Sequence, residues 1–229
     1  MSDIILNILC EGKTEERFVT TVLKPFLRKH NIYVKQRLLI TSKKNNSKGG
    51  IISYQQVERD LSVWAKECRT KINERHYFTT MFDLYALPND FPEKDKADKI
   101  HDEYERTKAI EIAFFENLKS SIDNFIPYIQ LHEIEALLFC DIDKLIAEFP
   151  ESKKEIEKLK NALATHHDNP ELINDGTQTA PSKRIEKALE GKYRYNKPNT
   201  IEYVTDIVVL REKCRHFNDW ISKLEKLND

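Results

Sequence analysis

Short apolar runs alternate with segments of helical spacing over the first two thirds of the chain, and this alternation limits the folds available. Residues 4–10 form the first apolar run, and Glu11-Gly12 ends it, which predicts a buried strand followed by a tight turn. Three further strands are predicted over residues 33–40, 77–82 and 125–131. Strands that alternate with helices favour a mostly parallel sheet with helices on both faces. We therefore predict a four-stranded α/β domain over residues 1–149.

Amphipathic helices are predicted between these strands and after the last one. Thr14 is the expected cap of the first helix, and Pro25 is expected to kink that helix or end it early because proline lacks a backbone N–H. The helical segments begin at Thr14, at Tyr54 (with spacing to Ile72), at about Asp98 (to Leu118, with Tyr104, Ile112 and Phe115) and at Glu133. Pro127 either weakens the case for the fourth strand or indicates an edge position for it.

The remaining part of the chain, residues 150–229, has a different character. It is lysine-rich and helical, with breaks at Asn169-Pro170, Asp175-Gly176 and Pro198. We predict a helical appendage that packs on the α/β core. Near its end, four apolar residues with helical spacing are expected to be core rather than interface: Trp220, Ile221, Leu224 and Leu227.

Composition bears on the compartment and on the class of ligand. The chain has no apolar run long enough to cross a membrane, and its start has no basic segment of the kind that opens a signal peptide. Its four cysteines are widely spaced and without a CxxC pair, so reduced, mostly buried thiols and a cytoplasmic location are expected. The formal net charge is −1, so any contact with nucleic acid needs a local basic patch.

Acidic residues follow three of the four predicted strands directly. Glu11 comes after the first strand, Asp83 after the third and Glu133 after the fourth. In a parallel sheet these positions share one edge, which is where ligands of open α/β sheets bind. Further candidates accompany them in the same segments: Glu15, Asp90, His132 and Glu135.

Carboxylates that meet at one site repel one another unless a counter-ion is present. Oxygen ligands suit Mg²⁺ or Mn²⁺, and such ions bridge phosphate oxygens and activate water. The sequence therefore predicts a divalent metal site for work on a phosphate backbone. The simpler interpretation is that these acidic residues are helix caps and turn residues, since acidic side chains favour helix N-termini.

Several motifs resemble a known family. Residues 11–15 (Glu-Gly-Lys-Thr-Glu) after the first strand are similar to the opening motif of TOPRIM domains, especially those of the overcoming-lysogenization-defect nucleases. Residues 82–92 and 130–139, with Asn174-Asp175 and residues 180–185 further on, resemble an uncharacterised bacterial TOPRIM-like family. Genes of that family often lie beside ABC-type ATPase genes in phage-defence neighbourhoods. The resemblance spans nearly the whole chain and implies a TOPRIM-like fold, an ATPase partner and a role in antiviral defence.

The resemblance also implies residue roles. Glu11 corresponds to the TOPRIM glutamate, a metal ligand in nucleases and an acid/base in topoisomerase-type enzymes. Asp83 corresponds to the first aspartate of the Asp-x-Asp pair, whereas Tyr85 stands at the second position, which departs from the pattern. Asp90 is a substitute candidate for that aspartate, and Glu133 or Glu135 would complete the metal shell.

A basic segment supplies candidate phosphate contacts. Residues 182–197 hold six Lys or Arg and two Glu, which leaves a local charge of +4. Ser182 is the expected cap of a helix whose N-terminus, with Lys183 and Arg184, would bind phosphate, and Lys183 is the candidate for transition-state charge. A solvated helix face is the alternative. Other candidate phosphate contacts are Lys13, His132 and a loop with Lys43, Lys44 and Lys48.

The resulting hypothesis is a Mg²⁺-dependent nuclease that hydrolyses DNA or RNA as the effector of an ATPase-linked defence system. One alternative is a catalytically degenerate TOPRIM-like module that binds the ATPase or nucleic acid without cleavage. A second alternative is nucleotidyl transfer of primase type, for which the sequence has no dedicated nucleotide motif. DNA versus RNA and formation of a homo-oligomer stay open.

Overall fold

A computed structural model describes residues 2–39, 50–174, 176, 178–191, 195–204 and 206–228. Every pairing between strands in this part of the chain is parallel, and the order across the sheet is β2-β1-β3-β4, with β5 pairing the end of β3. The mostly parallel α/β sheet expected from the sequence is therefore confirmed. The strands are β1 (Asp3–Cys10), β2 (Ile32–Leu38), β3 (Glu74–Asp83), β4 (Phe125–Ile126) and β5 (Ile129–Gln130).

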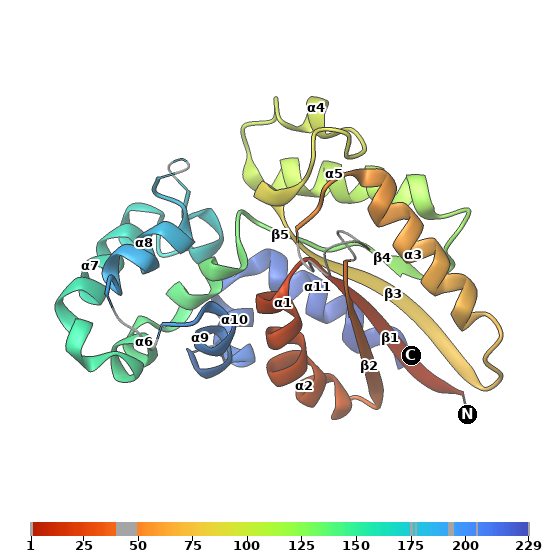
Figure 1. Cartoon of the computed structure of the whole chain (residues 1–229), viewed down its shortest axis with the longest axis horizontal. Coiled ribbons are helices and arrows are strands. Elements are labelled where there is room, and N and C mark those ends of the chain that lie inside the picture. The colour runs from red at the N-terminus through yellow and green to blue at the C-terminus, as the bar shows by residue number, and fades with distance from the viewer. Residues whose placement is uncertain are drawn as a thin grey trace.

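Helices cover the sheet and form the rest of the molecule (Figure 1). The α-helices are α1 (Lys13–Phe18), α2 (Lys24–Arg28), α3 (Tyr54–Cys68), α4 (Lys94–Ala97), α5 (Glu103–Leu118), α6 (Ile142–Glu148), α7 (Lys153–Thr165), α8 (Pro181–Ala188), α9 (Lys197–Val204), α10 (Ile207–Lys213) and α11 (Arg215–Glu225). The shorter elements are a π-helical segment (Val19–Leu23) and 3-10 helices at Leu84–Ala86, Ile134–Asp141 (η3), Pro150–Ser152, Pro170–Leu172 and Lys226–Asn228. None of the helices in the described segments is long and apolar enough to span a membrane.

Both faces of the sheet are buried, because β1 contributes side chains to two separate cores. Leu6 packs in a cluster that includes Phe217 of α11, whereas Leu9 packs in a second cluster with Trp64 of α3 and Phe114 of α5. Accordingly, α3 and α5 cover one face, while α1, α2 and α11 lie on the other (Figure 1). Burial on both faces explains why β1 is an almost continuous apolar run rather than an alternating one.

The helical region after residue 150 shares a core with the sheet. The indole N–H of Trp220 donates to Thr79 Oγ1 of β3 at 3.0 Å, and Ile221 and Leu224 are fully buried. The expectation that Trp220, Ile221, Leu224 and Leu227 are core residues is confirmed. In Figure 1, α6 to α9 gather at the end of the molecule away from α3, while α11 runs back along the sheet.

Prolines act locally rather than as chain breaks. The predicted fourth strand is split by Pro127 into β4 and β5, each two residues long, because proline donates no ladder hydrogen bond. The helix does not end at Pro25, because a π-helical segment leads from α1 into α2, where Pro25 is in the first turn. Thr14 is not the helix cap; Gly12 takes that position and Thr14 lies within α1.

Three helix predictions are corrected by the structure. The second predicted helix is α3, which ends at Cys68, and Ile72 beyond it is 87% exposed. The third predicted helix is α5, which begins at Glu103, where the Asp102 carboxylate accepts the N–H of Glu105. This helix exposes Ile112 and Phe115. Its buried side uses other residues, including Ile110, Phe114 and Leu118. The segment after Glu133 is the 3-10 helix η3 and not an α-helix.

All four cysteines are buried free thiols, as the sequence predicts. Cys140 of η3 and Cys214 at the start of α11 are neighbours, with their sulfur atoms 3.3 Å apart.

Candidate metal centre at the carboxyl edge of the sheet

Hydrogen bonds join the ends of three strands at one edge of the sheet. The Glu11 carboxylate, just after β1, accepts the backbone N–H of Asp83 at 3.1 Å. Asp83, the last residue of β3, accepts the N–H of Ile134 at 2.9 Å through Oδ1. Ile134 follows Glu133 in the segment that leaves β5. The convergence predicted from parallel topology is therefore present, and each carboxylate helps to hold the next segment in place.

Glu15 enters the same edge from the first turn of α1. Its Oε2 accepts the N–H of Gly12 at 2.7 Å, and the side chain is 5% exposed. A Cβ atom on Gly12 would stand 3.1 Å from that oxygen, which is tighter than an ordinary contact. Glycine at position 12 thus allows the Glu15 carboxylate to fold back over the turn that follows β1.

Glu133 and Glu135 are held by elements of the helical region. Glu133 accepts both donors of Ser182, the backbone N–H at 2.9 Å and the hydroxyl at 3.1 Å. Glu135, 5% exposed, forms an ion pair with Lys197, whose Nζ lies 3.1 Å from Oε1. Lys197 Nζ is also 3.5 Å from Glu186. Helices α8 and α9 therefore hold two of the carboxylates at this edge. We call the five acidic side chains the carboxylate cluster: Glu11, Glu15, Asp83, Glu133 and Glu135.

The electrostatics of the carboxylate cluster are those of crowded like charges. The pKa of Glu11 is raised to about 8, mainly by burial. The Asp83 N–H opposes this rise, and the negative charges of Glu15, Glu135 and Glu133 add to it. Burial, followed by the charges of Glu15 and Glu11, raises the pKa of Asp83 well above its usual value. These groups share the available protons at neutral pH, as expected for carboxylates with too few cations.

The pKa values of Glu15 and Glu135 are also raised by burial, but a nearby lysine opposes the rise. The pKa of Glu15 is raised to about 7, mainly by burial; the charge of Glu135 contributes to the rise, whereas backbone hydrogen bonds and the Lys197 ammonium oppose it. Burial also raises the pKa of Glu135, although Lys197 lowers it. Lys197 is thus an internal cation of the carboxylate cluster.

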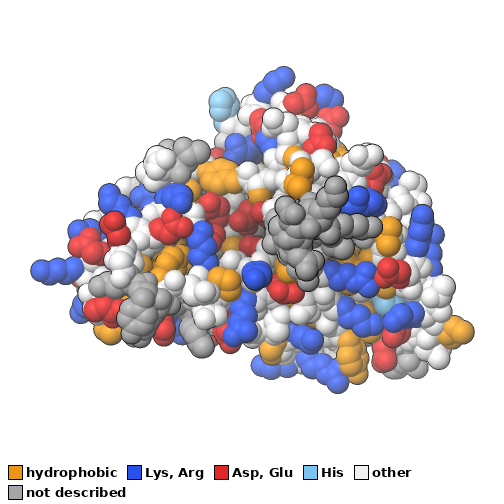
Figure 2. Space-filling model, viewed as in Figure 1, with side chains coloured by type: hydrophobic (Ala, Val, Ile, Leu, Met, Phe, Trp, Pro, Cys, Tyr) orange, Lys and Arg blue, Asp and Glu red, His pale blue; other side chains and the backbone are white. Residues whose placement is uncertain are grey.

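Seen from outside, acidic side chains gather near the middle of one face, with Lys and Arg side chains to either side (Figure 2). A family model described as a domain of unknown function, DUF4276, matches residues 10–225. The chain belongs to this family. A search of curated proteins and a search of solved structures found no match. The matched DUF4276 span contains the whole carboxylate cluster, from Glu11 to Glu135, together with Lys197.

His132 is the most unusual side chain at the edge of this DUF4276 sheet. It is fully buried, its backbone φ is +61°, and neither ring nitrogen has a hydrogen-bond partner among the residues that the structure describes. Its ring lies 5.3 Å from the ring of Tyr85. Burial, together with the charges of Arg106 and His166, lowers the pKa of His132 to about 4, so the imidazole is neutral. A buried, unpaired donor and acceptor next to Glu133 suits a polar ligand.

Other residues predicted from the sequence are placed around the DUF4276 carboxylate cluster with different partners. Asp90 accepts the N–H of Tyr54, the first residue of α3, at 3.0 and 3.1 Å, so its carboxylate is engaged at the start of that helix, beside the N-cap residue Ser53. Lys183 Nζ bonds Glu186 at 2.7 Å on an exposed helix surface. Arg184 Nε donates to Thr179 O at 2.6 Å.

Two further predictions concern residues at the ends of helices. Lys13 is exposed at the start of α1. Ser182 is not the cap of α8, because Ala180 holds that position and both Ser182 donors face Glu133. Lys43, Lys44 and Lys48, and the basic residues Lys192 and Arg194, lie outside the described residues.

The donor set of the carboxylate cluster fits a hard divalent cation in its chemistry. Its ligands would be carboxylate oxygens, and the raised pKa values of Glu11 and Asp83 mark the charge that such an ion would neutralise. Within the described segments, however, no three His, Cys, Asp or Glu side chains are arranged as a bound ion requires. Ser182 holds Glu133 and Lys197 holds Glu135, so these side chains must turn before they can act as ligands.

Proposed function

We propose that this protein is a Mg²⁺- or Mn²⁺-dependent nuclease that hydrolyses phosphodiester bonds in DNA or RNA. The observation that carries the proposal is the convergence of Glu11, Asp83 and Glu133 from three strand ends, where burial and like charges raise the pKa values of Glu11 and Asp83. The TOPRIM-like motifs support the same reaction and favour an ATPase partner in antiviral defence.

Glu11, Asp83 and Glu133 are the residues that would hold the ion, with Glu15 and Glu135 beside them. When bound, a divalent ion polarises the phosphate and lowers the pKa of water. Glu15, which stands beside these three ligands and whose pKa is raised to about 7, is suited to accept the proton of the attacking water at neutral pH. Its buried position in the first turn of α1 keeps this proton acceptor close to the sheet edge.

Positive and neutral donors stand where a phosphate would meet the carboxylate cluster. Lys197 is half-buried beside Glu135 and is better placed than the exposed Lys183 to stabilise charge on the pentacovalent phosphorus. Ser182 offers an N–H and a hydroxyl once Glu133 turns away. The imidazole of His132 is neutral because its pKa is lowered, and a neutral ring carries one N–H that can donate.

The test is cleavage of single- and double-stranded DNA and RNA with Mg²⁺ or Mn²⁺, with and without the candidate ATPase. We expect Glu11→Ala to reduce cleavage by at least about 100-fold, whereas Glu157→Ala, an exposed helix residue paired only loosely with Lys153, leaves it unchanged. Equal cleavage by the wild-type protein and Glu11→Ala would contradict the proposal.

A second candidate is a binding module that does not cleave. Tyr85 in place of the second aspartate favours it, as does the engagement of every carboxylate in a hydrogen bond or an ion pair. Calorimetric titration with Mn²⁺ separates the two candidates. Binding that is lost in Glu11→Ala supports the nuclease, whereas the absence of Glu11-dependent binding supports a module that binds the ATPase or nucleic acid.

A further inference from the structure

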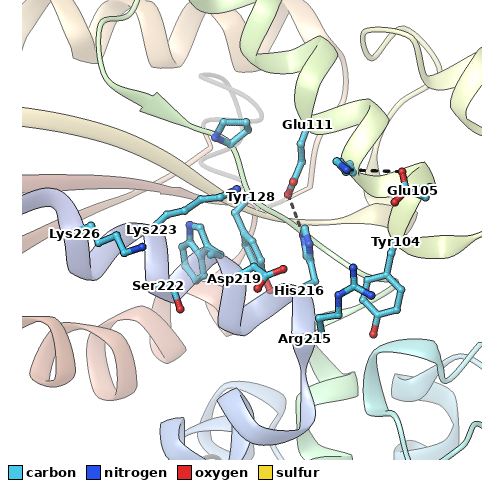
Figure 3. A pocket seen from close by; sticks show the side chains of 13 residues that line it. Tyr104, Glu105, Glu111, Tyr128, Arg215, His216, Asp219, Ser222, Lys223 and Lys226 are labelled. Atoms are coloured by element: carbon cyan, nitrogen blue, oxygen red, sulfur yellow. Dashed lines mark hydrogen bonds and ion pairs between the residues drawn. The ribbon is translucent and has the colours of Figure 1, made fainter.

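A separate cavity of about 350 Å³ lies between α5 and α11, beside β4 and β5. Figure 3 shows side chains of the two helices on opposite sides of this cavity, which we call the α5–α11 pocket. Its volume falls in the range of small-ligand pockets, which is about 300–1,000 Å³. None of the residues of the carboxylate cluster lines it.

The inner wall of the α5–α11 pocket is built from buried, hydrogen-bonded side chains. Glu111 Oε1 accepts the N–H of Ile129 at 2.8 Å and lies 3.0 Å from His216 Nε2, which is also 3.1 Å from Ile129 O. These contacts place the proton of a neutral His216 on Nε2, because both neighbours are acceptors. His216 Nδ1 then remains an acceptor, or a donor when the ring is protonated.

Aromatic rings fix the position of this wall. His216 stacks on Tyr128 at 5.2 Å, and Tyr128 stacks on Trp220 at 4.1 Å, with interplanar angles of 15° and 14°. Tyr128 is fully buried in the middle of the stack. The pocket therefore has a rigid wall that needs no rearrangement before a ligand binds.

The rim of the pocket carries more positive than negative charge. Four cations line it (Lys108, Arg215, Lys223 and Lys226), against the exposed acids Glu105 and Asp219, which leaves +2 if the buried Glu111–His216 pair is set apart. Within the described chain, Arg215, Lys223 and Lys226 make no ion pair, and Lys108 makes only a 3.9 Å contact with Glu105. On a protein with a net charge of −1, this rim is a local excess of positive charge, which attracts anions.

We propose that the α5–α11 pocket binds a phosphate-bearing ligand of mononucleotide size. The Arg215 guanidinium, which lies 5.1 Å from the ring centroid of Tyr104, and the ammonium groups of Lys223 and Lys226 would hold the phosphate. His216 and the Tyr104 ring supply surfaces for a planar base. The phosphate can belong to a free nucleotide or to the end of a nucleic acid, and both sources share this recognition chemistry.

The inner wall of the α5–α11 pocket is connected to the carboxylate cluster through β5. Glu111 and His216 hold both polar backbone atoms of Ile129, and Ile129 pairs with Phe82 in the sheet. The next residues along the chain are Gln130, which pairs with Asp83, and then the segment to Glu133. A ligand that contacts His216 therefore contacts a residue that holds β5 in place.

The experiment measures binding without divalent metal, in EDTA, so that the carboxylate cluster does not contribute. Calorimetric titrations use inorganic phosphate, a ribonucleoside 5′-monophosphate and a short 5′-phosphorylated single-stranded oligonucleotide. We expect saturable binding of the monophosphate that weakens at least 10-fold in the double variant Arg215→Ala/Lys223→Ala. Both positions are exposed, so the fold should be retained, which a thermal melt checks.

Two control variants separate this proposal from the nuclease proposal. Lys66→Ala removes an exposed lysine of α3, and Glu11→Ala alters the carboxylate cluster; neither should change the affinity for the monophosphate. Tighter binding of the oligonucleotide than of the monophosphate, lost in the double variant, identifies nucleic-acid ends as the source of the phosphate. Absence of saturable binding of all three probes, or affinity unchanged in the double variant, overturns the proposal whether or not the protein cleaves nucleic acid.

Discussion

The molecule buries carboxylates in two regions, and it treats them in opposite ways. Behind the sheet, against α11, Glu171 and Glu111 are each surrounded by donors. Glu171 accepts the N–H groups of His216 and Phe217 and the hydroxyl of Tyr104. Glu111 accepts from Ile129 N–H and faces His216. These carboxylates join elements distant in sequence, and hydrogen bonds to them offset part of their loss of hydration, although burial still raises the pKa of Glu171.

At the carboxyl edge of the sheet, the balance is reversed. Glu11, Asp83 and Glu15 accept backbone N–H groups of Asp83, Ile134 and Gly12, while they face one another's charges. Lys197 offsets part of this repulsion from one side. The comparison teaches that burial of an acid does not by itself indicate function. Crowding of like charges with too few donors does, since folding alone gains nothing from it.

The largest expected effect tests the structural role of Glu171. Glu171→Ala should lower the free energy of unfolding by about 3–5 kcal/mol, because it leaves two N–H groups at the start of α11 and the Tyr104 hydroxyl without their acceptor. Urea unfolding followed by circular dichroism measures the change. Glu171→Gln keeps one oxygen acceptor and should lose clearly less. A loss below 1 kcal/mol in Glu171→Ala would remove the contrast between the two regions.

The second prediction concerns pH and the carboxylate cluster. The folded-state pKa of Glu11, about 8, lies above its ordinary value of 4.5, so the folded protein binds more protons than the unfolded chain between these values. Stability of the metal-free protein should therefore fall as pH rises from 5 to 8, by about 2 kcal/mol. Glu11→Gln should flatten this slope and be more stable than wild type at pH 8. Urea unfolding at several pH values in EDTA measures both.

Adding Mn²⁺ at pH 8 sharpens the same test. A cation neutralises the carboxylates, so the wild type should regain stability and Glu11→Gln should not. Stability of the metal-free wild-type protein that rises between pH 5 and 8, with no difference in Glu11→Gln, would show that the cluster is not under the repulsion described above.

Much of this arrangement follows from sequence, for a physical reason. Apolar runs predict the strands, parallel pairing puts their ends at one edge, and so the meeting of Glu11 and Asp83 could be foreseen. What could not be foreseen depends on tertiary packing. The partner of Glu135 is Lys197, which reaches it only because α9 packs against α1 and η3.

Local patterns also admit more than one outcome. In α5, apolar residues are present on two faces of the helix. The buried face contains Ile110 and Phe114, whereas Ile112 and Phe115 are exposed. Asp90 was a candidate ligand because it follows Asp83 closely, but the intervening 3-10 turn carries it to the start of α3. The spacing of residues in the sequence determines neither the buried face of α5 nor the partner of Asp90, because both depend on which element packs against the segment.

The smallest expected effect concerns Ser182, which links the helical region to the carboxylate cluster. Ser182→Ala removes the hydroxyl that donates to Glu133 at 3.1 Å but keeps the backbone N–H at 2.9 Å. In EDTA, the variant should lose about 1 kcal/mol of unfolding free energy, the usual value for one hydrogen bond. Ser62→Ala, on the partly exposed surface of α3, serves as the matched control and should change stability by less than about 0.5 kcal/mol.

With saturating Mn²⁺, the cost of Ser182→Ala should shrink. If Glu133 turns from Ser182 to the ion, the hydroxyl no longer stabilises the folded protein, and the wild type and the variant should unfold at similar urea concentrations. A cost that stays the same with and without Mn²⁺ would mean that Glu133 remains bound to Ser182. Glu133 would then belong with Glu171, as a carboxylate that joins two parts of the fold, and the metal site would be reduced to Glu11, Glu15, Asp83 and Glu135.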